Sequence, residues 1–229
     1  MEQLSLEVRL ADHALFDTFF DGANAAAAYA LRDLLRSRVS AVLWLWGPVE
    51  TGKTHLLQAC VNEADEAALR AAYLPLGPGS ELSPEALDGM GELDVVCIDD
   101  VDAIAGNGRW EQALFLLFEG LRQRGARLIL AAQQAPLHCN FRLPDLASRF
   151  SSGATFRLRP LSDEDKLKAM QLRAVWRGLE LPDDTARYLL ARVDRSFNHL
   201  LELLDQLDRK ALAAQKKLTV PFVKSVLEK

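Results

Sequence analysis

A phosphate-binding pattern restricts this chain to folds in which a buried strand runs through a tight loop into a helix. Residues 47–54 match G-x-x-x-x-G-K-[ST]. The loop consists of Gly47, Pro48, Val49, Glu50, Thr51, Gly52, Lys53 and Thr54. Before it, residues 41–46 form a run of aliphatic, β-branched and aromatic side chains, which is typical of a buried strand.

The fixed positions of this loop suit a polyphosphate ligand. Gly47 and Gly52 allow backbone N–H groups to approach phosphate oxygens without interference from a Cβ atom. Lys53 provides a positive charge for the outer phosphates, and the Thr54 hydroxyl can join the ligand shell of Mg²⁺. The N-terminus of the following helix adds its positive dipole. The loop is therefore predicted to bind the phosphates of a nucleotide.

A second pattern further along the chain supplies acidic groups. Residues 95–98 are apolar, as in a central parallel strand, and Asp99 and Asp100 follow them. Ligands of open α/β sheets bind at the carboxyl ends of the strands. There Asp99 can hold Mg²⁺, and Asp100 can orient an attacking water. Either pattern alone could be an ordinary strand and turn, but together they predict a site for a purine nucleotide with Mg²⁺.

Size and composition exclude several classes of protein. The 229 residues suffice for one α/β domain and a small second domain. A net charge of −5 argues against a basic DNA-binding face, so we expect little direct DNA binding. Neither a membrane-spanning run nor a signal peptide is recognisable, and three scattered cysteines predict no metal cage or disulfide framework. We therefore expect a cytoplasmic protein without a membrane partner.

Strand and helix patterns alternate through most of the chain, which predicts an α/β fold with a parallel sheet. Strands are expected at residues 41–46, 72–76, 95–98, 128–132 and 154–158. A helix from about residue 24 to 38 precedes them, with Asn24 as its N-cap. After Pro160 the pattern is helical only and begins with a capping sequence at residues 162–165. The expected parts are a flexible tail at 1–12, a nucleotide-binding domain at 13–159 and a small helical lid at 160–229.

Several segments resemble the AAA+ ATPases of the DnaA/Hda family, most closely its regulatory Hda branch. Besides the loop and the paired aspartates, the likeness is carried by residues 143–149 (LPDLASR), 161–166 (LSDEDK), 204–208 (LDQLD) and 218–224 (LTVPFVK). It extends over nearly the whole chain. The resemblance implies an AAA+ fold with ADP or ATP and Mg²⁺ as cofactors. It also implies a regulator that lacks the DNA-binding domain found after the lid of the initiator.

The resemblance also implies partners. Gln3, Leu4, Ser5 and Leu6 are similar to the peptide that docks proteins on the replicative sliding clamp, although six such residues in isolation would more often be a plain leader. Arg149 is similar to the family's arginine finger, although an arginine ending a short helix can simply complement the helix dipole. In this family the regulator acts with the DNA-loaded clamp. It stimulates hydrolysis of ATP bound to DnaA, which inhibits initiation of replication. Homo-oligomer formation stays open.

Two positions depart from the family pattern. Gln133 stands where the pattern has an aspartate as sensor 1, and Asn198 stands where it has the sensor-2 arginine. Arg195, about one helical turn earlier, is the candidate replacement. Glutamine can hydrogen-bond a water or a phosphate but carries no charge, so we expect weak intrinsic ATPase activity. Two alternatives remain: an ATPase in its own right, such as a helicase-loader-like remodeler, and a clamp-tethered adaptor stiffened by its nucleotide.

Overall fold

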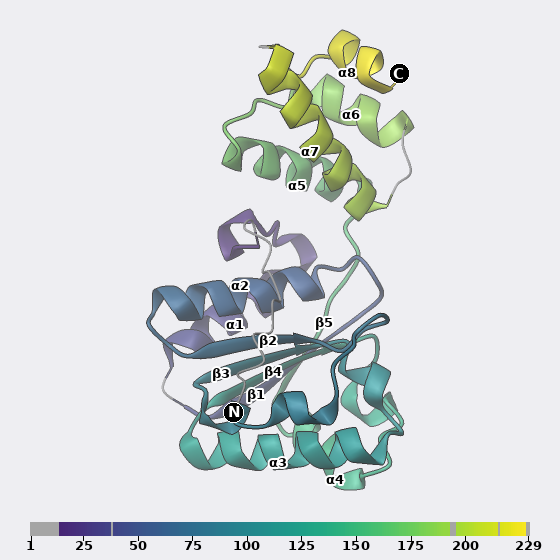
Figure 1. The fold of residues 1–229 in the computed structure, drawn as a ribbon. Coiled ribbons are helices and arrows are strands. Elements are labelled where there is room, and N and C mark those ends of the chain that lie inside the picture. Colours follow the sequence, from purple (N-terminus) through teal and green to yellow (C-terminus); the bar gives the residue numbers. More distant parts are fainter. Residues whose placement is uncertain (1–13, 38, 193–195, 215, 228–229) are drawn as a thin grey trace. The chain divides into compact units, whose positions relative to one another are not determined.

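The computed structural model describes residues 14–37, 39–192, 196–214 and 216–227, and these form two compact units (Figure 1). The first unit comprises the described residues up to Phe16 together with Ala23–Arg159. The second comprises Asp17–Gly22 and the described residues from Pro160 onwards. Among all the described residues, no helix is both long enough and apolar enough to span a bilayer.

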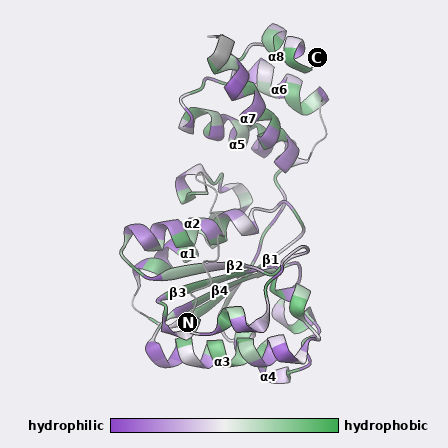
Figure 2. Cartoon of the chain, in the orientation of Figure 1, coloured by the Kyte–Doolittle hydropathy of each residue, from purple (hydrophilic) through white to green (hydrophobic). Residues whose placement is uncertain are grey.

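A parallel sheet of five strands forms the centre of the first unit, which confirms the predicted α/β fold. The strands are β1 (Ala41–Trp46), β2 (Ala71–Pro75), β3 (Val95–Asp99), β4 (Arg127–Ala132) and β5 (Ala154–Arg157). Their order is β2-β3-β4-β1-β5, and all neighbouring pairs are parallel. Parallel strands need crossover connections, which cover both faces with helices. Every residue of β3 and β4 is accordingly buried, and Figure 2 shows the hydrophobic colour along the strands.

Helices cover the two faces of this sheet (Figure 1). Helices α1 (Ala25–Arg36) and α2 (Lys53–Glu66) lie on one face, and α3 (Gly108–Arg124) and α4 (Pro144–Ser151) lie on the other. Short 3-10 turns complete the unit: η3 (Pro84–Leu87), η4 (Met90–Glu92), η5 (Val101–Ile104) and η6 (Pro136–His138). Turns η1 (Phe16–Thr18) and η2 (Gly22–Asn24) lie where the chain passes between the two units. On the face of the sheet that α3 covers, the ring centroids of Trp44 and Phe150 lie 5.6 Å apart, and both side chains are fully buried. Burying side chains of this size contributes about 1.5–3 kcal/mol each.

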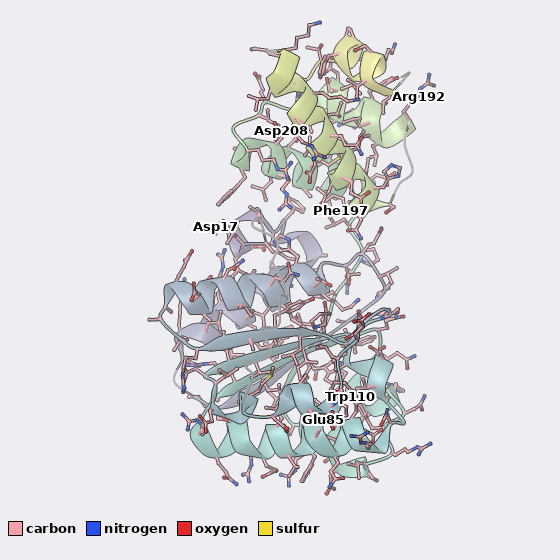
Figure 3. All side chains as sticks on the ribbon, in the orientation of Figure 1. Asp17, Glu85, Trp110, Arg192, Phe197 and Asp208 are labelled. Atoms are coloured by element: carbon pink, nitrogen blue, oxygen red, sulfur yellow. The ribbon has the colours of Figure 1, made fainter. Side chains whose placement is uncertain are left out.

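Helix α3 has a capped first turn and a glycine at its end. Asn107 caps its first turn by accepting a hydrogen bond from the backbone of Arg109, and Gly125 ends it in a left-handed conformation with φ 76°. Beside its start, the Arg109 guanidinium pairs with Glu85 of η3 at 2.6 Å. Figure 3 shows Glu85 and Trp110 at this contact between η3 and α3. The elements that follow β2 and β3 are thereby packed together.

Asn24 does not cap α1, contrary to the prediction. Its side chain makes no capping bond and instead pairs with the backbone of Arg159. Asn24 Nδ2 donates to the Arg159 carbonyl at 3.0 Å, and Asn24 Oδ1 accepts from the Arg159 N–H at 2.8 Å. The side chain is therefore satisfied by a partner 135 residues away. A local sequence pattern carries no information about such a partner.

The second unit is helical. It contains α5 (Asp163–Trp176), α6 (Asp183–Arg192), α7 (Phe197–Ala214) and α8 (Val220–Leu227). Ser162 caps α5 as predicted, because its hydroxyl accepts from the Asp165 N–H at 3.1 Å. Met170 is buried in a leucine-rich core, whereas Trp176 is 49% exposed. Residues three or four positions apart lie on the same face of a helix. Ala174, four residues after Met170, therefore shares its buried face, whereas Trp176 does not.

Candidate functional site

The phosphate-binding loop leads from β1 into α2, as the sequence predicts. Its first residue is tied to β4, because the Gly47 N–H donates to the Ala132 carbonyl at 3.3 Å. A Cβ atom at Gly47 would lie 2.5 Å from the carbonyl oxygen of Leu158, so only glycine fits there. Gly52 precedes α2 in a left-handed conformation with φ 88°. Both fixed glycines of the pattern are thus required by the backbone geometry.

Lys53 is held beneath this loop. Its side chain is buried, and Nζ donates to the carbonyls of Gly47 at 2.8 Å and Pro48 at 2.7 Å. Burial lowers the pKa of Lys53, while the nearby negative charges of Asp99 and Asp100 act in the opposite direction. An ammonium has three donors, so the lysine can fix the loop and still bind a phosphate oxygen.

Thr54 and Asp99, predicted to hold a metal ion, are in direct contact. The Thr54 hydroxyl donates to Asp99 Oδ2 at 2.6 Å. Asp99 is only 2% exposed, and its Oδ1 accepts from the Asp100 N–H at 3.1 Å. A hydroxyl and a carboxylate are the hard oxygen ligands that Mg²⁺ prefers, and Mg²⁺ usually takes its remaining ligands from phosphates and water. No cluster of three or more metal-binding side chains occurs among the described residues.

Asp100 is more accessible than Asp99 and has an unusual backbone. Its φ of 51° lies in the left-handed region, which few residues other than glycine adopt. Burial, followed by the negative charges of Asp99 and Asp102, raises the pKa of the Asp100 carboxyl. Gly77, in the loop after β2, leaves room for this carboxylate, since a Cβ atom there would collide with it. Strain and a raised pKa are frequent at functional sites.

Gln133 lies at the end of β4, near the acidic residues. Its side chain is exposed, and its backbone N–H donates to Asp102 Oδ2 at 3.1 Å. Asp102 was not predicted from the sequence, although it belongs to the same acidic run as Asp99 and Asp100. Asp102 therefore joins the segment after β3 to the end of β4.

Arg149 lies on the other side of the sheet from α2. It is in the last turn of α4, and its side chain is 44% exposed. The guanidinium Nη2 is 3.7 Å from Oε1 of Glu119 and the guanidinium carbon is 5.8 Å from the ring centroid of Phe118, both on α3. Helix α3 thus holds a cation that remains accessible to solvent.

Glu111, which the sequence analysis also missed, fixes the segment that leads into α4. It is fully buried in the first turn of α3. Its carboxylate accepts three backbone hydrogen bonds, from Gly106 at 2.7 Å, Arg142 at 3.0 Å and Leu143 at 2.8 Å. The sequence contains one sign of this role, which is an acidic residue next to the apolar face of a helix.

The remaining predicted residues are not among the described residues of the first unit. Asn198 is exposed in the first turn of α7 in the second unit. Arg195, Gln3, Leu4, Ser5 and Leu6 lie outside the described residues. The roles inferred for these positions stay predictions.

Comparisons with known proteins agree with this architecture. Residues 163–227 match the family model of the Hda lid domain. Domain III of the Thermotoga maritima replication initiation protein DnaA has a TM-score of 0.77 and 23% identity, covering 96% of this chain and 98% of that one. AMPPCP-bound DnaA from Aquifex aeolicus has a TM-score of 0.71 and 24% identity, covering 86% and 66%. The Thermotoga maritima RuvB Holliday junction branch migration motor has a TM-score of 0.64 and 18% identity, covering 91% and 68%. At these identities the solved structures show a shared fold.

Proposed function

We propose that this chain, which has the fold of the AAA+ proteins and whose residues 163–227 match the family model of the Hda lid domain, is a negative regulator of chromosome replication initiation. In this proposal it binds DnaA and, together with the DNA-loaded sliding clamp, stimulates hydrolysis of the ATP that DnaA holds. The product is the inactive ADP form of DnaA. The chain would thus act mainly on a nucleotide bound by its partner.

The chain's own ligand in this proposal is ADP or ATP with Mg²⁺. The loop of residues 47–54 would hold the phosphates, with Lys53 providing the charge. Thr54 and Asp99 would hold the cation, which neutralises phosphate charge, and Asp100 would orient a water. Two similar DnaA structures contain the ATP analogue AMPPCP, which supports an adenine nucleotide. Gln133, Asn198 and Arg195 are proposed as further nucleotide-binding residues because they stand at or beside the sensor positions of the family pattern.

The observation that carries the proposal is the position of Arg149. The residue is exposed, is held by Glu119 and Phe118, and lies on the face of the sheet opposite α2, which begins at Lys53. This arrangement supports action on a nucleotide held by another subunit. A guanidinium is always charged and forks across two oxygens, which suits the charge that develops on a transferring phosphoryl group.

The experiment that tests this role mixes the purified chain with clamp, DNA and ATP-loaded DnaA and follows ADP formation. Arginine fingers contribute about 10³–10⁵ in rate, so Arg149→Ala should abolish the stimulation while nucleotide and clamp binding persist. Arg149→Lys should rescue poorly, because a point charge lacks the fork. Arg36→Ala, at a side chain 75% exposed on α1, is the matched control. Stimulation by Arg149→Ala at the unmutated rate would refute the role of Arg149.

A second candidate function is an ATPase in its own right, such as a helicase-loader-like remodeler. The complete loop and the Thr54–Asp99 contact favour it. The replacement of charged sensors by Gln133 and Asn198 favours weak turnover instead. Steady-state ATP hydrolysis by the isolated chain distinguishes the two functions. A rate like that of an active AAA+ motor would support the remodeler.

A further inference from the structure

The hydroxyl of Tyr73 reaches the carboxylate of Asp99 from the neighbouring strand. Strands β2 and β3 pair so that Tyr73 lies opposite Cys97, two residues before Asp99. Tyr73 Oη donates to Asp99 Oδ2 at 3.0 Å, and the Thr54 hydroxyl donates to the same oxygen at 2.6 Å. The other carboxylate oxygen accepts from the Asp100 backbone at 3.1 Å. Three elements therefore fix the orientation of this buried group.

Tyr73 also contacts the helix that carries Thr54. The Gln58 side chain, on α2 one turn beyond Thr54, hydrogen-bonds to the Tyr73 hydroxyl. A tyrosine hydroxyl is protonated at neutral pH, so it can donate to the Asp99 carboxylate. A phenylalanine at this position would keep the ring and its packing but would lack the hydroxyl. Tyr73→Phe would therefore remove the hydrogen bond to Asp99.

We propose that Tyr73 is a positioning residue for the metal end of the nucleotide site. Its hydroxyl holds Asp99 Oδ2 beside the Thr54 hydroxyl, so that both residues keep one relative geometry when the cation arrives. Mg²⁺ demands near-ideal octahedral geometry. Hydrogen-bond partners of metal ligands orient those ligands, and their loss typically costs about 10–100-fold in metal affinity. This inference rests on the proposed function, because the cation enters with a nucleotide.

The test uses the full chain with ADP, Mn²⁺ as a spectroscopic substitute for Mg²⁺, and the variant Tyr73→Phe. Electron paramagnetic resonance gives the affinity of the ADP complex for Mn²⁺, and calorimetry in EDTA gives the affinity for ADP without metal. We expect Mn²⁺ to bind at least about 10-fold more weakly to the variant, with the affinity for ADP in EDTA unchanged. Tyr29→Phe, at a residue 74% exposed on α1, is the matched control and should behave as the wild type.

Two results would overturn this role. Wild-type affinity for Mn²⁺ in Tyr73→Phe would show that the hydroxyl only fills space. An equal loss of ADP affinity in EDTA would show that Tyr73 supports the whole loop rather than the metal ligands. The proposed nucleotide site is tested separately by the wild type. If the wild type binds no ADP, the nucleotide proposal fails and the role of Tyr73 falls with it.

Discussion

The side chain of Lys53 is held in place by the loop of residues 47–54. Its two bonds to the carbonyls of Gly47 and Pro48 hold the ammonium beneath the loop, and the nearby aspartates favour its charged form. A ligand therefore meets a cation whose position is already restricted. Such preorganisation lowers the entropic cost of binding.

Lys53→Ala should weaken binding of both ADP and ATP while the fold persists. A charge-assisted hydrogen bond contributes about 1.5–3 kcal/mol, which corresponds to roughly 10–100-fold in affinity. Titration calorimetry measures both affinities, and Lys210→Ala on α7 serves as the control at an exposed lysine. Unchanged affinities in Lys53→Ala would show that the phosphates bind elsewhere.

The candidate site could be predicted from the sequence only where its residues are contiguous. The loop of residues 47–54 and the pair Asp99–Asp100 are local patterns, because a tight turn and a strand end need few residues. Tyr73 and Glu111 gave no such signal. Their roles depend on hydrogen bonds to distant segments, such as the pairing of β2 with β3 that brings Tyr73 to Asp99.

At the scale of elements, strands were predicted more accurately than helix ends. Residues 41–46 were predicted as a strand and form β1, because a short apolar run between two turns allows few other positions for the ends of the strand. For the helix after the loop, the sequence predicts residues 53 to about 62, but α2 continues to Glu66. Ala64 is fully buried there, so tertiary packing extends the helix further than its local sequence indicates.

Helix α3 organises the segment before α4 through the buried carboxylate of Glu111. Glu111→Ala would remove the acceptor of three partly buried hydrogen bonds from backbone N–H groups, and a hydrogen bond to a charged group contributes about 1.5–3 kcal/mol. We therefore expect a loss of at least about 3 kcal/mol in the free energy of unfolding, measured by urea denaturation. Glu66→Ala, at an exposed acid ending α2, is the control. A loss no greater than in that control would mean that water replaces the carboxylate.

At the scale of the whole molecule, the proposed function needs a connection to the clamp. Replacing Gln3, Leu4 and Leu6 with alanine removes an amide and two apolar side chains from the predicted clamp peptide. Clamp binding in a pull-down should fall sharply, while the affinity for ADP should stay unchanged. Alanine at Glu7 and Arg9 is the control for general effects on the first residues. Undiminished clamp binding would mean that the connection lies elsewhere in the chain.

The strand order β2-β3-β4-β1-β5 has a bearing on how the protein is made. Strand β1 pairs only with β4 and β5, and β4 begins about 80 residues after β1 ends. At about 5–20 residues per second, a ribosome needs roughly 4–16 s to synthesise that interval. Until then both edges of the apolar run Ala41–Trp46 lack their partners, and such edges are templates for pairing with other chains. The strand that leads into the phosphate loop is therefore the one that a nascent chain leaves unprotected longest.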